Sequence, residues 1–223
     1  MEKFLTTKAL FPHGYGAAEE LLNNSEYPWE ILKDIGSFIE ALGNKLPESD
    51  YIRHPGNVWI ARTATIAQSA FLGTNIIVGP GTAIRHCAFL RGNALIGNNC
   101  VVGNSAEIKN SILIEEVEAP HFNYIGDSIL GYGTHLGAGV ITSNIKSDRT
   151  NVEIRVSDDR IKTELRKMGA IIGDLVEIGC NAVLNPGTVI GVGSRIYPLT
   201  MVRGYVPSHS ILKQDGTLSA IDT

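Results

Sequence analysis

The sequence predicts a mainly β protein, a parallel β-helix of short stacked strands preceded by a small helical segment. A six-residue repeat covers most of the chain, and a helical pattern is confined to residues 1–56. The composition, 43% hydrophobic and 19% charged, is ordinary for a globular chain. The formal net charge is −4, whereas nucleic-acid and membrane-surface binders usually carry a basic excess. We therefore expect small-molecule partners, with no nucleic acid and no membrane.

The repeat is a run of six-residue units, each led by an aliphatic residue, usually followed by Gly and, four positions on, by a small residue. The leading positions are 60, 66, 72, 78, 84, 90, 96, 102, 108 and 114, and then 172, 178, 184, 190, 196 and 202. A period of six fits neither a helix nor simple strand alternation and is typical of a solenoid. We expect the leading side chains to stack inside, where each contributes about 1.5–3 kcal/mol. Ile96→Asp or Ile178→Asp is predicted to prevent folding.

The N-terminal segment reads EYPWEILKDIGSFIEALG over residues 26–43. Its apolar residues Trp29, Leu32, Ile35, Ile39 and Leu42 recur at helical spacing and predict an amphipathic helix. With a shorter helix around GAAEELL, it is expected to cover the exposed end of the β-helix. The predicted domains are a helical cap and linker at 1–56, the β-helix at 57–208 with a charged inserted loop at 145–170, and a tail at 209–223.

The stretch PHFNYIGDS, residues 120–128, interrupts the repeat. Proline occupies position 120, the next position in phase, and the following aliphatic residues are Ile125, Leu130 and Leu136, so that one spacing shrinks to five. Regular local patterns are usually broken where function requires it. This break therefore predicts a functional site.

The residues around the break carry a resemblance to a known family. FLRGNALIG, AEIKNSI and HFNYIGDSILGYGTHLGAGVITSN are similar to the acetyltransferase domain of the bifunctional enzymes that make UDP-N-acetylglucosamine. These are hexapeptide-repeat proteins, left-handed parallel β-helices with three units per coil. The resemblance implies that His121 is the general base. It also implies that Tyr124 and Asn144 hold an amino sugar, and that Arg91 and Lys109 bind its phosphate.

Further along, RIKTELRKMGAIIGDLVEIGCNAVLNPGTVIG resembles the C-terminal β-helix of sugar-1-phosphate nucleotidylyltransferases. Two departures affect the substrate. His135 stands where the family has a sugar-binding asparagine, and the family's lysines have no counterpart at Thr150 and Glu153. The sequence also contains no Gly-rich GxGTRxxPxTxxxPK-like element, so we expect no pyrophosphorylase activity.

The chemistry of these residues supports acetyl transfer independently of the family. A neutral imidazole at His121 is a suitable acceptor for the proton of a sugar ammonium. Backbone N–H groups of the turn at Gly137, Ala138 and Gly139 are candidate donors to the oxyanion formed from acetyl-CoA. Arg91 and Lys109 are one 18-residue coil apart and are expected to stack and grip one phosphate.

These observations predict a cytoplasmic acetyl-CoA-dependent N-acetyltransferase of nucleotide-sugar biosynthesis. Glucosamine-1-phosphate and galactosamine-1-phosphate are the preferred acceptors, a nucleotide-linked amino sugar stays open, and the acyl group can be larger than acetyl. Asp127 is interpreted as a turn residue. The family implies a homotrimer with its sites between subunits, and the 145–170 loop is either solvated or reaches a neighbouring subunit. The chain has no apolar run long enough to span a membrane, and from its first residues we expect no signal peptide.

Two other classes stay open. A zinc hydratase would need three converging imidazoles, but none of the six histidines forms the closely spaced pair such a site uses, and no metal is expected. A non-catalytic scaffold or regulatory subunit for a separate nucleotidylyltransferase would bind no acetyl-CoA. The cysteines Cys87, Cys100 and Cys180 are far apart and predict buried packing residues rather than disulfides.

Overall fold

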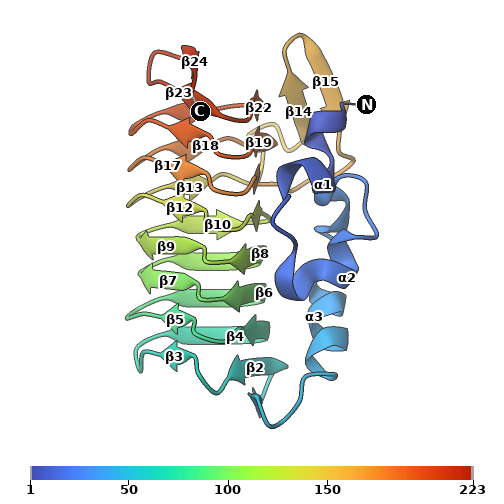
Figure 1. The fold of residues 1–223 in the computed structure, drawn as a ribbon, viewed down its shortest axis with the longest axis vertical. Helices are drawn as coiled ribbons and strands as arrows, with labels where there is room; N and C mark the ends of the chain where they lie inside the picture. Colours follow the sequence, from blue (N-terminus) through green and yellow to red (C-terminus); the bar gives the residue numbers. More distant parts are fainter. Residues whose placement is uncertain (1, 222–223) are drawn as a thin grey trace.

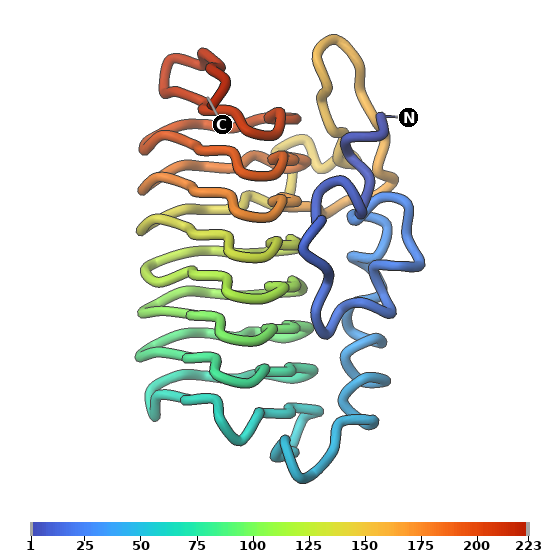
Figure 2. Tube along the Cα trace, viewed as in Figure 1, coloured from blue at the N-terminus to red at the C-terminus, as the bar shows by residue number. Residues whose placement is uncertain are grey.

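The computed structural model describes residues 2–221. Its main body is a solenoid of stacked parallel coils, with the N-terminal helices lying along one side (Figure 1). The coils rise regularly from β2 near one end to β23 near the other, as the trace in Figure 2 shows. The predicted mainly β class, a parallel β-helix with a small helical segment, is confirmed.

The solenoid strands form three rows. The first row contains the N-terminal halves of β4 (Phe71–Val78), β6 (Phe89–Asn98) and β8 (Glu107–Glu115), followed by β10 (Tyr124–Gly126), β13 (Ile141–Thr142), β18 (Val183–Leu184) and β21 (Met201–Val202). The second contains β2 (Val58–Ala61), the C-terminal halves of β4, β6 and β8, and then β11 (Ile129–Leu130), β16 (Ala170–Ile172), β19 (Thr188–Ile190) and β22 (Tyr205–Val206). The third contains β3 (Thr65–Ile66), β5 (Ala83–Ile84), β7 (Val101–Asn104), β9 (Glu118–His121), β12 (His135–Leu136), β17 (Glu177–Ile178), β20 (Arg195–Ile196) and β23 (Ser210–Leu212).

The inner core largely follows the predicted phase. Ile84, Leu90, Ile96, Val102 and Ile108 are buried in one cluster, together with all six later leading positions from 172 to 202. The repeat then shortens earlier than expected. Leu113, not Ile114, takes the next inward place, five residues after Ile108, and Leu130 follows Ile125 at the same spacing. Leu72 therefore pairs with Leu90, eighteen residues on, but Ile108 pairs with Ile125, seventeen residues on.

The N-terminal segment is a chain of short helices. They are η1 (Lys3–Leu5), α1 (Thr7–Leu10), η2 (Gly16–Ala18), α2 (Glu19–Leu22), η3 (Pro28–Ile31) and α3 (Ile35–Gly43). The single helix predicted within residues 26–43 is thus divided between η3 and α3. At this division the Leu32 carbonyl accepts a hydrogen bond from the Asn110 side chain of the solenoid at 3.0 Å.

The sequence suggested that the helices cover the exposed end of the solenoid, and this prediction is wrong. The helices pack on the outer face of the second row. The outward residues of this row are also apolar, and they pack with the helices in a second buried cluster: Trp59, Ile77, Leu95, Ile112, Ile129, Ile171 and Val189. A strand row that is apolar on both faces must be covered. The coil ends are closed instead by antiparallel strands, β1 (Tyr51–His54) on β2 and β24 (Leu218–Ala220) on β23. The apolar residue before every third leading position was the signal for this arrangement.

The charged insertion is a β-hairpin of β14 (Glu153–Val156) and β15 (Asp159–Lys162), which projects beside the upper coils (Figure 1). Val152, Ile154 and Met168 are buried in the cluster beneath the N-terminal helices. The segment is therefore more than a solvated loop, because its base extends the second core.

Of the three cysteines, which were all predicted to be buried, only Cys100 is buried. Cys87 and Cys180 are exposed, and Cys87 has a left-handed corner conformation (φ 59°).

Between residues 2 and 221 no helix combines the length and apolar character needed to cross a membrane.

Candidate functional site

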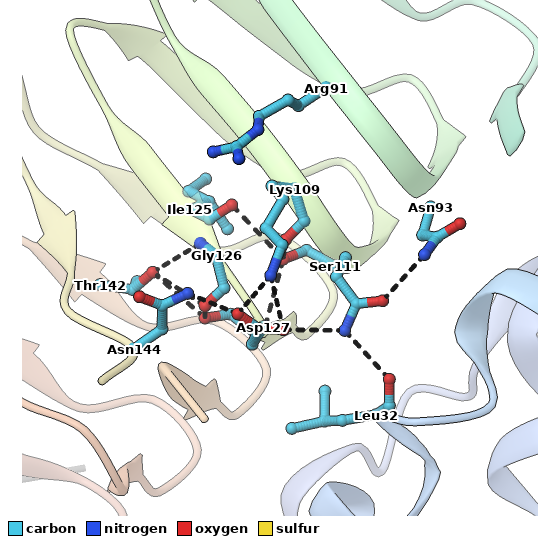
Figure 3. Close-up of polar contacts among 12 residues, drawn as sticks. Leu32, Arg91, Asn93, Lys109, Ser111, Ile125, Gly126, Asp127, Thr142 and Asn144 are labelled. Atoms are coloured by element: carbon cyan, nitrogen blue, oxygen red, sulfur yellow. Dashed lines mark hydrogen bonds and ion pairs between the residues drawn. The ribbon is translucent and has the colours of Figure 1, made fainter. Parts of the chain in front are cut away.

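Three of the predicted site residues, Lys109, Tyr124 and Asn144, come together at the corner between the first and second rows, where the two five-residue spacings lie. Lys109 comes from β8, Asp127 from the turn after β10, and Asn144 from the segment that leaves β13 toward the hairpin. Figure 3 shows their side chains pointing toward one another, with Arg91 of β6 apart from their dashed contacts. This corner is where the solenoid gathers polar groups from successive coils.

Arg91 does not stack directly on Lys109. Leu90 pairs with Ile108, but Gly92 pairs with Lys109, so Arg91 is the extra residue of a β-bulge and the expected stacking is wrong in detail. Its Nη1 atom contacts Glu107 Oε1 at 3.0 Å, and its side chain is 52% exposed. The hydrogen bond and charge of Glu107 raise the pKa of the Arg91 guanidinium. This cation is accessible and carries its own counter-ion.

Lys109 is held more firmly. Its ammonium lies 2.9 Å from Asp127 Oδ2 and 3.1 Å from Oδ1, with the Lys109 side chain 24% and the Asp127 side chain 6% exposed. Asp127 Oδ1 also accepts from Asn110 Nδ2 at 3.0 Å, and Oδ2 accepts from Asn144 Nδ2. Asp127 does occupy a turn, with φ 49°. The sequence interpretation missed that its carboxylate joins three polar side chains; the eighteen-residue interval from Lys109 was the available signal.

Tyr124 lies between Glu107 and Ile141 in the first row and is half-buried. Burial is the main cause that raises the pKa of its phenol, and the negative charges of Glu107 and Asp127 raise it further. The positive charge of Arg91 lowers this pKa. A Cβ atom at Gly126 would lie 2.6 Å from Tyr124 Oη and 3.0 Å from Asn144 Nδ2. The absent side chain at Gly126 thus lets Tyr124 and Asn144 approach each other.

His121 stands at the end of β9, one corner before Tyr124, and is exposed. Its backbone is fixed: the N–H donates to Asn123 Oδ1 at 3.1 Å and the carbonyl accepts from Gly139 N–H at 3.0 Å. Asn123 is buried and donates in turn to the Gly137 carbonyl. The imidazole itself makes no hydrogen bond with the described part of the chain. A fixed backbone with an open ring nitrogen is compatible with proton transfer.

The glycine turn after β12 offers fewer free donors than expected. Gly137 N–H donates to the Ile178 carbonyl at 2.7 Å, and Gly139 N–H donates to the His121 carbonyl. These two N–H groups complete the hydrogen bonding of the coil, so Gly137 and Gly139 are not free as the candidate donors that the sequence suggested. Within residues 2–221, the Ala138 N–H is the member of this turn that makes no backbone hydrogen bond.

His135 lies apart from the Lys109 cluster, on β12 in the third row. Its Nδ1 contacts Glu177 Oε2 at 3.0 Å, and its Nε2 is 3.9 Å from Glu118 Oε2. These glutamates are its register partners above and below. In the described residues no group of three His, Cys, Asp or Glu side chains is arranged to hold a metal ion.

Comparison with known proteins confirms the resemblance. The chain is 34% identical over 176 residues to a bifunctional protein GlmU of Methanococcus maripaludis, which covers 78% of this chain and 43% of the relative. It is 38% identical over 92 residues to a bifunctional sugar-1-phosphate nucleotidylyltransferase/acetyltransferase of Sulfurisphaera tokodaii, covering 41% of this chain and 23% of the relative. The chain thus spans less than half the length of these relatives. No family model matches.

Among solved structures, the chain is similar to a UDP-N-acetylglucosamine acyltransferase of Francisella novicida. The identity is 16%, the TM-score is 0.38, and the match covers 74% of this chain and 68% of that one.

Proposed function

We propose that this chain is an acetyl-CoA-dependent N-acetyltransferase whose acceptor is an amino-sugar phosphate. The observation that carries the proposal is the convergence of Lys109, Tyr124 and Asn144 around Gly126 and Asp127, one corner away from an exposed histidine. Figure 3 shows Lys109 and Asn144 beside Asp127. A cation, two neutral hydrogen-bonding groups and a base are the parts that binding and deprotonating a phosphorylated amine require. The Sulfurisphaera tokodaii relative, which is named as a bifunctional sugar-1-phosphate nucleotidylyltransferase/acetyltransferase, supports the same reaction.

In the proposed reaction, His121 takes a proton from the acceptor's ammonium, and the amine attacks the thioester carbonyl of acetyl-CoA. The carbonyl oxygen becomes an oxyanion, for which the Ala138 N–H is the available donor. When the intermediate collapses, the C–S bond breaks as the C–N bond is retained. The leaving thiolate takes the proton from the imidazolium, and the second proton of the attacking nitrogen is released to solvent.

Binding of the phosphate is assigned to Lys109 and Arg91. Lys109 is partly exposed and keeps N–H capacity beyond its contact with Asp127, while the accessible Arg91 can exchange Glu107 for a phosphate oxygen. Tyr124 and Asn144 are proposed to contact the sugar. We favour glucosamine-1-phosphate, then galactosamine-1-phosphate.

We further propose that the active unit is a homotrimer with the site between subunits. The first row presents a stripe of exposed apolar side chains on both sides of the polar residues: Phe71, Phe89, Ile141, Val183 and Met201. Contiguous exposed apolar surface usually marks an interface. A neighbouring copy packed on this stripe would also cover Tyr124. A monomer at micromolar concentration in sedimentation equilibrium would contradict this assembly.

The test of function is coenzyme A release from acetyl-CoA, followed with a thiol reagent against a panel of acceptors. The panel contains glucosamine-1-phosphate, galactosamine-1-phosphate, unphosphorylated glucosamine and a nucleotide-linked glucosamine. We expect release with one of the two sugar phosphates and little with free glucosamine. Absence of acetyl-CoA binding in calorimetry would favour the scaffold alternative and overturn the proposal.

A further inference from the structure

A ladder of polar side chains runs along the corner between the first and second rows and ends at Asp127. We call it the asparagine ladder; its members are Asn57, Asn75, Asn93, Asn110 and Asp127, all left-handed with φ between 47° and 58°. Each asparagine amide donates to the next member's Oδ1, at 3.2, 3.2, 3.4 and 3.0 Å in order. Asparagine and aspartate tolerate this backbone better than other side chains.

The N-terminal segment packs on this ladder. Asn110 Nδ2 donates to the Leu32 carbonyl at 3.0 Å as well as to Asp127. A Cβ at Gly36 of α3 would lie 2.9 Å from Asn93 Oδ1, so this helix is in close contact with the Asn93 side chain of the ladder. Asn110 is therefore fixed from two sides, and it fixes one oxygen of Asp127.

Beyond Asp127 the ladder ends. The matching corner positions of the next coils are glycines, and they continue only the backbone bonds: Gly169 N–H donates to the Asp127 carbonyl, and Gly187 N–H to that of Gly169. The next coil has no ladder side chain for residue 127 to bond, so an asparagine at this position would serve the ladder equally well. The negative charge of Asp127 must therefore have another role.

That role concerns Lys109 and Asn144, which both donate hydrogen bonds to the Asp127 carboxylate. Lys109 and Asn144 can only donate from the atoms that face Asp127, and Asn110 donates too. A carboxylate accepts at both oxygens, whereas an amide would direct an NH2 group at one of these donors. The aspartate is 6% exposed, and hydrogen bonds to a buried charge are stronger than neutral ones.

We propose that Asp127 is a positioning residue that sets the Lys109 ammonium and the Asn144 amide for the acceptor. The inference rests on the proposed function, because Lys109 and Asn144 are assigned there to the phosphate and the sugar. Asp127 does not itself contact the acceptor. It aligns two groups from different coils with a single carboxylate, which is held by Asn110 and through it by Leu32 of the N-terminal segment.

The experiment compares Asp127→Asn, Asp127→Glu and Asn75→Ala in the full chain. Asp127→Asn keeps the shape and the tolerance for the left-handed backbone but removes the charge. Asp127→Glu keeps the charge but displaces it. Asn75→Ala is the matched control, since it breaks the same ladder at a left-handed position far from Lys109 and is expected to lower the melting temperature only.

For Asp127→Asn we expect KM for the sugar phosphate to rise about tenfold to hundredfold, the range for losing hydrogen bonds to a charged group. The KM for acetyl-CoA should change by less than about threefold, because Lys109 and Asn144 are assigned to the sugar phosphate. Asp127→Glu should fail to restore KM, and Asn75→Ala should leave it unchanged. If Asp127→Asn keeps the acceptor KM within about threefold, a change too small for such a loss, the proposal is overturned.

A second readout separates this proposal from the proposed function. The rate at which acetic anhydride modifies Lys109, followed by peptide mass spectrometry, needs no acceptor. If wild-type protein acetylates no member of the panel, the proposed function fails, and this rate then decides the role of Asp127. Faster modification in Asp127→Asn than in wild type and Asn75→Ala supports the proposal, and an unchanged rate overturns it.

Discussion

The Lys109 corner and the His121 corner of the same coils are built in different ways. At the first, Lys109 and Asp127 are mostly buried, and the carboxylate is bonded to three side chains. At the second, the backbone of His121 is fixed by Asn123, but the ring is exposed and makes no hydrogen bond within residues 2–221. The side that we propose for the acceptor is therefore held in place by contacts within the chain. The side that we propose for the general base is open to a ligand or a neighbouring subunit.

The shortened repeat accounts for part of this difference. In each five-residue spacing a buried serine accepts from the backbone of the following coil: Ser111 Oγ from Ser128 N–H at 3.1 Å, and Ser128 Oγ from Ala170 N–H at 3.0 Å. Removing one residue would leave backbone donors without partners, and the serines satisfy them. The two serines therefore keep these backbone donors paired where the repeat is one residue shorter.

The strongest test of the comparison is His121→Ala. General base catalysis typically contributes about 10² to 10⁴ in rate, so kcat should fall by that factor. The melting temperature should hardly change, since His121 is not part of either core. The exposed His54→Ala serves as the control and should keep full activity. Activity within about threefold of wild type would exclude the general-base role.

The next test separates the two cations. Lys109→Ala leaves the buried Asp127 carboxylate without its partner, so we expect KM for the sugar phosphate to rise about tenfold to hundredfold together with a lower melting temperature. Arg91→Ala removes an exposed partner and should raise KM about fivefold without a thermal shift. Steady-state kinetics and calorimetry measure both. Equal thermal effects would contradict the difference in burial.

How much of this the sequence predicted depends on the kind of interaction. The inward positions from Ile84 to Ile108 and from Ile172 onward were predictable, because a fixed period sets which side chains face the core. Leu113 in place of Ile114 was not, because both are aliphatic and only the register of neighbouring coils distinguishes them.

The candidate site divides in the same way. The motif indicated Arg91, Lys109, Tyr124 and Asn144. The bulge at Arg91, the contact of Asp127 with Asn144, and the glutamates on either side of His135 depend on which residues lie above one another after the repeat shortens. An interval of 17 instead of 18 residues changes every such neighbour, so a strict six-residue phase misplaces them.

A smaller effect is expected from Gly126→Ala. The added methyl group would overlap Tyr124 Oη and approach Asn144 Nδ2, and both side chains would have to move apart. We expect KM for the acceptor to rise about threefold to tenfold, because overpacking costs about 1–3 kcal/mol and part of that is expected to appear in acceptor binding. The KM for acetyl-CoA should change little. Steady-state kinetics with each substrate varied in turn measures this. An unchanged acceptor KM would show that the closeness of Tyr124 and Asn144 does not matter for binding.

The smallest expected effect comes from Glu107→Gln, and it is a gain. In the proposed site, Glu107 would compete with the phosphate for Arg91, whose Nη1 atom lies 3.0 Å from Glu107 Oε1 in a partly exposed ion pair. Removing this charge should lower KM for the sugar phosphate about twofold to fivefold, the range for a partly exposed ion pair. Because salt screens exposed charges, the gain should shrink as ionic strength rises from 0.01 to 1 M. The same substitution in an Arg91→Ala background should have no effect on KM, since no guanidinium is left to release. A lower KM in that background would mean that Glu107 repels the phosphate directly and does not act through Arg91.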